Sequence, residues 1–114
     1  MQRGDIYMTD FSNSGCLQTG IRPVIIIQNN IGNHFSPTTI VCCITSKKRN
    51  KTNIPTHCFI GTNGGLVKNS IVLCEQIFTV NQSDLKQYIG TITNQSILDK
   101  LDKCVSISLG LNKK

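Results

Sequence analysis

Arg22 is the residue whose type and position most suggest chemistry, because it stands directly before Pro23 and a strongly apolar run. Val24–Ile27 is an unbroken β-branched stretch, which is typical of a strand buried on both faces. The residue before a proline favours an extended backbone, so Arg22 should lie at the entrance of that strand. Two interpretations are open: an arginine whose head reaches water, or an anion receptor on a rigid element.

Thr45 is predicted to lie beside Arg22. A second β-branched segment, Thr38–Thr45, follows the first after a short polar stretch, and the two should form an antiparallel hairpin. If Asn29 pairs with Thr38 at the closed end, Arg22 lies opposite Thr45 at the open end. Directly opposed side chains have Cβ atoms about 4.5–5.5 Å apart, whereas a slip of one residue would separate the pair. The sequence therefore predicts a cation and a hydroxyl group at one edge of a sheet.

A cluster of cations follows Thr45 almost immediately, formed by Lys47, Lys48, Arg49 and Lys51. The whole chain has 12 Lys and Arg against 6 Asp and Glu, a balance that favours a polyanionic partner. A basic run on its own is often only a solvated loop. Beside Arg22 and Thr45 it favours phosphate binding, and hence a nucleic acid.

An arginine with a hydroxyl group suits the cleavage of RNA by its own 2′-hydroxyl group. The substrate supplies the nucleophile, so the protein has to orient it, provide a proton route and stabilise a pentacoordinate phosphorane. The guanidinium fork matches phosphate oxygens, but it stays protonated in proteins and is therefore a poor general base. His34 and His57 are candidates for the base because histidine titrates near neutrality, although a structural role is the commoner one for each.

The rest of the chain supplies the elements that must position these residues. Apolar patterns and turn signals predict further strands at 4–9, 54–60, 70–80 and 88–92, the last one at an edge, with polar loops at 11–19, 30–37 and 46–53. Thr62–Gly65 indicates a hairpin-type turn. Thr93 or Asn94 can cap a helix that runs to Leu109 and stops at Gly110. We expect a single domain over residues 1–114: a mainly β, partly closed antiparallel barrel with a C-terminal helix.

The six cysteines raise the question of disulfides or zinc, and neither fits the pattern. There is no Cys-x-x-Cys pair and there are only two histidines. We expect most cysteines to be reduced and to pack as small apolar residues, with Cys16, in a polar loop, as the exception. No apolar run approaches the ~20 residues that span a bilayer, and Arg3 and Asp5 argue against a signal peptide. We therefore expect a cytoplasmic protein with no metal, cofactor or membrane partner.

Ordered blocks along the chain resemble the MazF/PemK family of bacterial toxins. The resemblance covers essentially the whole chain, and chance does not produce so many blocks in order. The blocks are Arg3-Gly4-Asp5-Ile6-Tyr7, Gly20-Ile21-Arg22-Pro23-Val24, Gln28-Asn29, Ser36-Pro37-Thr38, Ile44-Thr45, Pro55-Thr56-His57, Ser70-Ile71-Val72, Glu75-Gln76-Ile77 and Ile107-Ser108-Leu109-Gly110-Leu111.

The resemblance implies an SH3-like barrel of the CcdB/PemK type that forms a homodimer. It implies a metal-independent endoribonuclease that cuts single-stranded RNA, chiefly mRNA, at a short sequence, and so inhibits translation and growth. The products would carry 2′,3′-cyclic phosphate and 5′-hydroxyl ends. The implied partner is a MazE-like antitoxin whose acidic, disordered tail covers the RNA groove, with DNA contacted only through the antitoxin complex.

Carried over by position, the resemblance makes Arg22 and Thr45 the catalytic pair, in agreement with the predicted strand pairing. Gln18 and Gln76 match residues near bound RNA. Ser70 and Glu75 lie in the same matched blocks, where a structural role is about as common as a functional one. The residues expected near RNA are therefore Cys16, Gln18, Lys47, Lys48, Arg49, Lys51, Ser70, Glu75 and Gln76.

The chain also departs from the family pattern. Cys16 and Leu17 stand where a Ser-Glu pair is common, Phe78 stands where an Arg is common, and the 11–19 loop is a residue shorter than in close relatives. Cys16 is open to two interpretations, a redox-sensitive lid residue or a size match for Ser. These departures lie near the expected RNA groove, so they affect the sequence preference.

Two other functions remain open. A CcdB-like inhibitor of DNA gyrase would share the fold and act by binding, without needing Arg22 beside Thr45. A non-catalytic RNA-binding barrel would normally offer aromatic residues for base stacking, whereas the chain has four Phe, two Tyr and no Trp. The arrangement of Arg22 and Thr45 favours the nuclease.

Overall fold

The computed structural model describes residues 1–11, 20–46 and 54–111 of the chain. Its strands and helices follow in the order β1 (Asp5–Asp10), β2 (Ile21–Ile26), α1 (Asn30–Phe35), β3 (Thr38–Ser46), β4 (His57–Gly61), η1 (Asn63–Gly65), β5 (Ser70–Asn81), η2 (Gln82–Asp84), β6 (Leu85–Thr91) and α2 (Gln95–Leu109). The two η elements are single 3₁₀ turns. The predicted strands and the C-terminal helix are confirmed.

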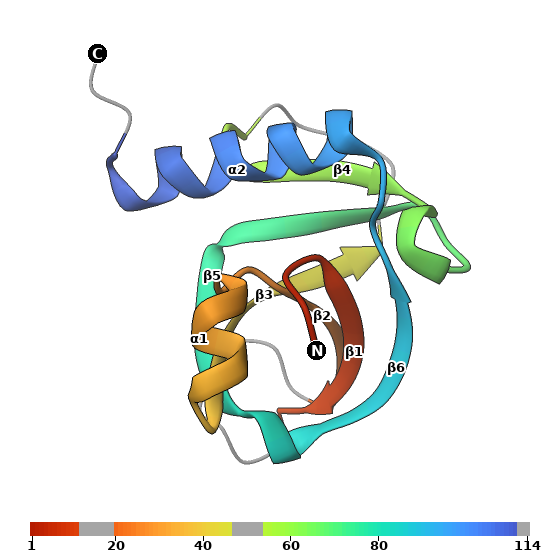
Figure 1. Ribbon diagram of the computed structural model, residues 1–114. Helices are drawn as coiled ribbons and strands as arrows, with labels where there is room; N and C mark the ends of the chain where they lie inside the picture. The colour runs from red at the N-terminus through yellow and green to blue at the C-terminus, as the bar shows by residue number, and fades with distance from the viewer. Residues whose placement is uncertain (12–19, 47–53, 112–114) are drawn as a thin grey trace.

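The strands form one antiparallel sheet that curls into an open barrel, with α2 lying across one side (Figure 1). The strand order is β4-β5-β3-β2-β1-β6, so β4 and β6 are its two edges. Within the described residues these edges are not hydrogen-bonded to each other, and the barrel is therefore only partly closed. The prediction of a partly closed antiparallel barrel, with its last strand at an edge, is confirmed.

The register between β2 and β3 agrees with the prediction from the sequence. Val24 lies opposite Cys43, and Ile26 lies opposite Val41. Val24, Ile25 and Ile26 are fully buried, which confirms a strand covered on both faces. If this register continues for two more residues towards the strand ends, Arg22 lies opposite Thr45.

The loop predicted at 30–37 is wrong, because most of it forms the short helix α1. The Asn29 side chain caps the helix by accepting a hydrogen bond from the backbone N–H of Gly32 at 2.7 Å. At the other end, Nε2 of Gln82 donates to the carbonyl oxygens of Asn33 at 2.9 Å and of Ser36 at 2.8 Å. The cap at Asn29 was therefore a local signal for this helix, whereas the contact with Gln82, which is distant in sequence, could not be read from a local pattern.

Strand β5 is continuous but sharply bent (Figure 1). Cys43 of β3 pairs with Leu73, whereas its neighbour Cys42 pairs with Ile77, so residues 74–76 of β5 have no opposite residue on β3. Such an insertion bends a strand and redirects its side chains. The bend separates the half of β5 that pairs with β4 from the half that leads to β6.

Two apolar clusters occupy opposite faces of the sheet. The first lies between the sheet and α2 and includes Ile25, Cys42 and Leu101. The second lies on the other face and consists of Phe11, Val24, Ile26, Val41 and Cys43, with partly buried residues packed against it. Neighbouring residues of a strand belong to different clusters because side chains alternate between faces.

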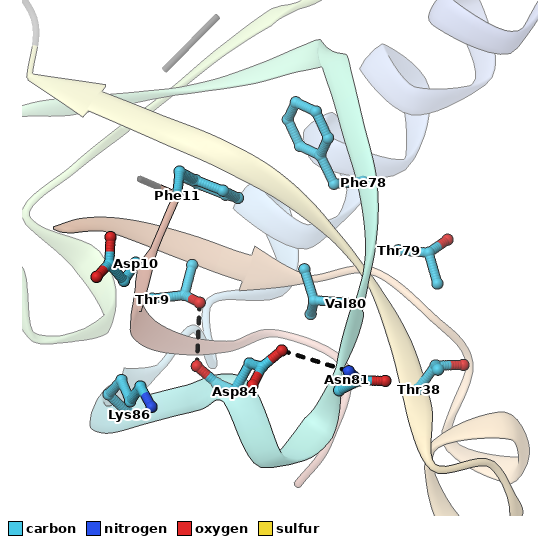
Figure 2. Close-up of a pocket in the computed structure, with 10 residues that line it drawn as sticks. All are labelled: Thr9, Asp10, Phe11, Thr38, Phe78, Thr79, Val80, Asn81, Asp84 and Lys86. Carbon is cyan, nitrogen blue, oxygen red and sulfur yellow. Dashed lines mark hydrogen bonds between the residues drawn. The ribbon is translucent and has the colours of Figure 1, made fainter. Parts of the chain in front are cut away.

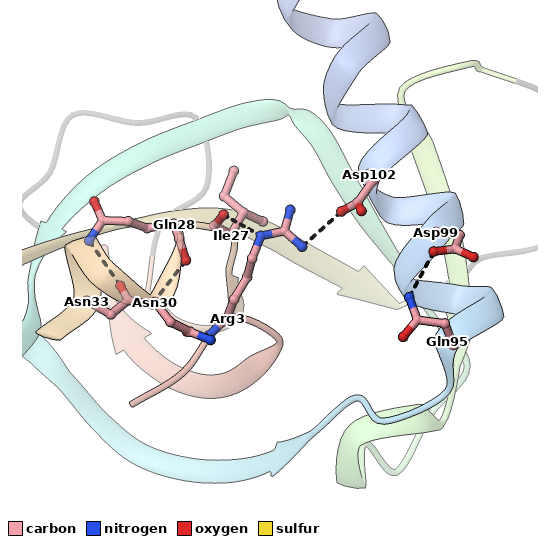
Figure 3. A network of polar contacts seen from close by, with 8 residues as sticks. All are labelled: Arg3, Ile27, Gln28, Asn30, Asn33, Gln95, Asp99 and Asp102. Carbon is pink, nitrogen blue, oxygen red and sulfur yellow. Dashed lines mark hydrogen bonds and ion pairs between the residues drawn. The ribbon is translucent and has the colours of Figure 1, made fainter.

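Helix α2 is fixed at both ends and along its side. The side chain of Asn94 accepts hydrogen bonds from the backbone N–H groups of its first turn, and Gly110 ends it in the left-handed conformation at φ 73°. Arg3 pairs with Asp102 at 2.9 Å and donates from Nε to the carbonyl oxygen of Ile27 at 2.8 Å, which ties the N-terminus to the helix (Figure 3). None of the helices in the described part of the chain is long and apolar enough to cross a membrane.

The cysteines behave as the sequence predicted wherever the structure describes them. Cys42, Cys43, Cys58 and Cys74 are buried and Cys104 is half-buried, and within the described part of the chain these five form no disulfide with one another. Burial raises the pKa of the Cys58 thiol to about 12, so this thiol stays protonated and unreactive near neutrality. Cys16 lies outside the described residues.

Gly90 is predicted to be essential for the close approach of β6 to η1. A methyl group on Gly90 would overlap the carbonyl oxygen of Gly64, which is backbone and cannot rotate away. We expect Gly90→Ala to lower the free energy of unfolding by ~1–3 kcal/mol, the usual cost of such an overlap. Urea denaturation measures this loss, with Gln87→Ala, an exposed position on the same strand, as the control. Equal stability of the two variants would contradict the prediction.

Candidate active site

Arg22 and Thr45 line the same hollow, which has a volume of 310 Å³ and lies where the ends of β2 and β3 meet the segment before β5. Alternation along each strand puts these two side chains on the face of Val24 and Cys43, whereas Ile44 and Leu66, which also line the hollow, belong to the cluster on the other face. The hollow is therefore bounded by residues of both faces at the strand ends. Arg22 is half-buried and also lies opposite Thr9 of β1. The hollow thus joins the predicted cation and hydroxyl group at a rigid part of the sheet.

The walls of this hollow are mainly apolar. Ile21, Leu66 and Val67 contribute to them, and Ile21 and Val67 are among the exposed large apolar residues of the molecule. Because Ile21 and Val67 are exposed, their side chains are available for apolar contact with a ligand held at Arg22.

Ser70 also lines the hollow, but its hydroxyl group has a structural partner. It is 5% exposed, and its Oγ donates to the carbonyl oxygen of Lys68 at 2.8 Å. Ser70 pairs with Ser46 at the end of β3, beside Thr45. The structure therefore supports a positioning role for Ser70 as a strand-capping hydroxyl, and direct contact with RNA stays a prediction.

Lys68 is a lining residue that the sequence analysis missed. It is exposed, lies two residues before β5 and shares the hollow with Arg22 and Thr45. Arg22 and Lys68 are the cations that line this hollow within the described ranges. The only signal in the sequence is a lysine two residues before Ser70, which no local pattern separates from a solvated surface lysine. Gln18 and the basic residues Lys47, Lys48, Arg49 and Lys51 lie outside the described residues.

Glu75 and Gln76 lie at the bend of β5 and do not line the hollow of Arg22. The Glu75 carboxylate accepts hydrogen bonds from Oγ1 of Thr56 at 2.9 Å and from Nε2 of His57 at 3.1 Å. Burial alone would raise the pKa of Glu75, but the hydrogen bonds from Thr56, a backbone N–H and His57 outweigh it, so the pKa lies below its usual value. Glu75 is therefore an ionised, structurally paired carboxylate near neutrality.

Gln76 has a buried side-chain oxygen, Oε1, with no hydrogen-bond partner among the described residues. Unpaired buried acceptors are uncommon in folded proteins, because losing water without gaining a partner costs free energy. A donor group on a ligand would satisfy this oxygen. The predicted proximity of Gln76 to RNA is compatible with this observation and stays a prediction.

Neither histidine lies in the hollow with Arg22. His57 is bound to Glu75, and the exposed His34 packs edge-on against Phe35, with ring centroids 4.6 Å apart. Among the described lining residues there is no His, Asp or Glu. The hollow therefore supplies cations and hydroxyl groups to a phosphate, and the suggestion that one of these histidines is the general base receives no support.

The fold is shared with solved structures of an endoribonuclease and of MazF. Solved structures over the whole chain include an endoribonuclease in complex with its cognate antitoxin from Mycobacterial species, with a TM-score of 0.81, 25% identity, and 100% and 99% of the two chains covered. MazF from Deinococcus radiodurans superimposes with a TM-score of 0.77 at 17% identity, covering 96% of each chain, and this likeness shows the fold alone.

The family follows from the sequence. The pattern of the PemK-like, MazF-like toxins of type II toxin-antitoxin systems matches residues 2–109. The chain is 45% identical to endoribonuclease MazF of Staphylococcus epidermidis, with 98% of this chain and 93% of that protein covered. It is 42% identical to endoribonuclease EndoA of Bacillus subtilis, with 97% and 96% covered. The chain belongs to the PemK-like, MazF-like toxin family, and the resemblance noted in the sequence is confirmed.

The lowered pKa of Glu75 predicts how its contribution to stability depends on pH. The folded-state pKa lies below the unfolded-state value, so the stabilisation is present above the unfolded pKa and is lost as the pH falls through the folded pKa. We expect Glu75→Gln to be less stable than the wild type at pH 7, with a gap that shrinks below pH ~4. Urea denaturation as a function of pH measures the gap, with Asp99→Asn as the control. A gap independent of pH would contradict the assignment.

Proposed function

We propose that this chain is the toxin of a type II toxin–antitoxin system and acts as a sequence-specific endoribonuclease on single-stranded RNA, chiefly mRNA, and thereby inhibits translation and growth. The observation that carries the proposal is the hollow shared by Arg22, Thr45 and Lys68 on a fold of the MazF type. A gyrase inhibitor of the CcdB kind would have no use for this arrangement. The names of the relatives support the same activity.

The proposed reaction needs no metal and no nucleophile from the protein. The 2′-oxygen of the substrate attacks the adjacent phosphorus, the bond from phosphorus to the 5′-oxygen breaks, and a proton passes to that leaving oxygen. The products are a 2′,3′-cyclic phosphate and a 5′-hydroxyl end. Arg22 holds and neutralises the non-bridging oxygens of the phosphorane through its planar fork. Thr45, at the next strand, orients the 2′-hydroxyl group by hydrogen bonding.

Lys68 has a complementary role in this proposal. An ammonium group is a point charge on a flexible stem, so it can follow a phosphate without requiring a fixed geometry. At the mouth of the hollow, Lys68 neutralises the scissile phosphate or the one beside it, and the Ser70 hydroxyl group fixes the backbone from which it extends. The basic run at 47–51 and Gln18 would extend the same RNA surface.

We propose the same partners as the resemblance implies. A MazE-like antitoxin with an acidic tail would compete with RNA for the cationic surface, and DNA would be contacted only through that complex. The solved complex of an endoribonuclease with its cognate antitoxin from Mycobacterial species supports this part of the proposal. The active species would be a homodimer in the bacterial cytoplasm.

The activity and the role of Arg22 are tested together. Purified protein should cleave single-stranded RNA in EDTA and leave cyclic phosphate and 5′-hydroxyl ends. Because the guanidinium fork stabilises the phosphorane, we expect Arg22→Lys to lower kcat by about 10²–10³. Thr45→Ser should keep most of the activity and Thr45→Val should lose it. Circular dichroism shows whether each variant is folded.

Wild-type activity in a folded Arg22→Ala protein would overturn the catalytic assignment. Growth arrest with intact mRNA and stalled gyrase would instead identify the gyrase inhibitor. Mapping of 5′ ends in transcripts after brief expression distinguishes these outcomes and gives the recognition sequence.

Lys68 is expected to contribute one phosphate contact. Lys68→Met should weaken RNA binding and reduce the slope of log affinity against log salt by about 0.7, the value for one neutralised phosphate on a single strand. Binding to an uncleavable 2′-deoxy analogue, measured by fluorescence anisotropy between low and moderate salt, gives this slope. Lys103→Met, on the exposed side of α2, is the matched control and should leave the slope unchanged. An unchanged slope in Lys68→Met would remove Lys68 from the RNA surface.

A further inference from the structure

A second and larger hollow of 540 Å³ lies where the end of β1 meets the last part of β5 and the start of β6 (Figure 2). Phe11 and Phe78 form one side of it, and Asn81 and Asp84 form the other, with Val80 between them. Its volume falls within the range of about 300–1,000 Å³ that is usual for small-molecule sites. The hollow is large enough for a nucleobase.

This hollow lies on the same face of the sheet as Arg22 and Thr45. Thr9 lines it, and Thr9 is the residue directly opposite Arg22 in the pairing of β1 with β2. Phe78 and Val80 pack against the apolar cluster of Val24 and Cys43, whose strands carry Arg22 and Thr45 on that face. Thr9 and Val24 are themselves buried, so the two hollows are linked by packed residues of one sheet face, and the proposal places an RNA strand over that face.

The charges in the hollow favour a base over a phosphate. Among the described residues that line it are two carboxylates, Asp10 and Asp84, and one cation, Lys86, a set that favours a hydrogen-bond donor over a phosphate. A carboxylate offers only acceptors, and it pairs best with the exocyclic amino groups of adenine, cytosine or guanine. Uracil has no exocyclic amino group and can offer a carboxylate only its ring N3–H. Lys86 can neutralise the phosphate next to the bound base.

Asp84 is held in place to act as such an acceptor. Oγ1 of Thr9 donates to its backbone carbonyl oxygen at 3.1 Å, and Nδ2 of Asn81 reaches its carboxylate at 3.4 Å (Figure 2). The second of these hydrogen bonds is long and therefore weak. An ionised carboxylate has about four acceptor positions, so this contact leaves Asp84 with capacity for a donor from a ligand.

Phe78 provides the surface on which a base can stack. Its ring centroid lies 5.4 Å from that of Phe11, and the two rings are tilted by 48°. Phe11 is 2% exposed and packs against the ring of Phe78, whereas Phe78 itself is only partly buried. Stacking on an aromatic ring tolerates every base, so Phe78 would supply affinity and Asp84 would supply selectivity.

We propose that this hollow is the subsite that reads one base beside the cleaved bond, with Phe78 as the stacking surface and Asp84 as the acceptor that selects an amino-bearing base over uracil. The proposal rests on the proposed function, because it places an RNA strand on this face. It differs from the role of Arg22, since neither Phe78 nor Asp84 touches the reacting phosphate.

Cleavage of a mixed-sequence RNA, followed by mapping of 5′ ends, tests the proposal. One position beside the cleaved bond should favour adenine, cytosine or guanine over uracil in the wild type, and Asp84→Asn should reduce that preference by about five- to tenfold in kcat/KM. Phe78→Leu should raise KM about tenfold whatever the base, with kcat little changed. Asp99→Asn and Phe59→Leu, which make the same changes outside the hollow, are the matched controls.

A second measurement separates failure of this proposal from failure of the proposed function. Arg22→Ala is titrated with the homopolymers rA6, rC6 and rU6, and the backbone amide signals of Thr79, Asn81 and Lys86 are followed by NMR. The proposal predicts larger shifts with rA6 or rC6 than with rU6, whether or not the wild type cleaves RNA. Equal shifts, or none, would overturn it.

Two further outcomes are decisive. If the wild type cleaves RNA and both variants keep its base preference and KM, the hollow is not a base subsite and the proposed function stands. If Phe78→Leu and Asp84→Asn lose affinity for the antitoxin while base preference is unchanged, the hollow belongs to the antitoxin and the proposal is wrong.

Discussion

The antiparallel register of β2 and β3 is the constraint on which the rest of this structure depends. Val24 and Ile26 are fully buried on one face and Ile25 on the other, so a slip of one residue would exchange the two apolar clusters. The same register, continued by two residues to the strand ends, would place Arg22 across from Thr45. The packing of Val24–Ile26 thereby fixes the backbone position of Arg22 before any ligand binds.

Local patterns were enough to predict the strands and α2, and long-range contacts decided the rest. The burial of Val24–Ile26 follows from a β-branched run, and α2 follows from its apolar spacing and its caps at Asn94 and Gly110. The helix α1 has a local cap at Asn29, but its contact with Gln82, directly after β5, cannot be read from local patterns. The bend of β5 was missed for the same reason, since it is defined by pairing with β3.

The candidate site was predictable only in part. Sequence patterns indicate contacts between the two strands of a hairpin, but not contacts between segments that are distant in the chain. Arg22 and Thr45 could be paired from the sequence because both lie on neighbouring strands of one hairpin. Lys68 and the hollow beside Phe78 could not, because each forms where segments distant in the chain meet. Glu75 lies in a matched block, yet its carboxylate is bound to Thr56 and His57 and does not face Arg22. The matched sequence block therefore indicated the region in which Glu75 lies, but it did not determine the role of its carboxylate.

The central claim is that Arg22 and Thr45 act on one phosphate as a unit, and a double-mutant cycle tests it most directly. Single-turnover cleavage rates are measured for the wild type, Arg22→Ala, Thr45→Ala and the double variant, all shown to be folded. Residues that act as a unit are strongly non-additive, so the double variant should be about as slow as the slower single variant. Losses that multiply independently would contradict the account.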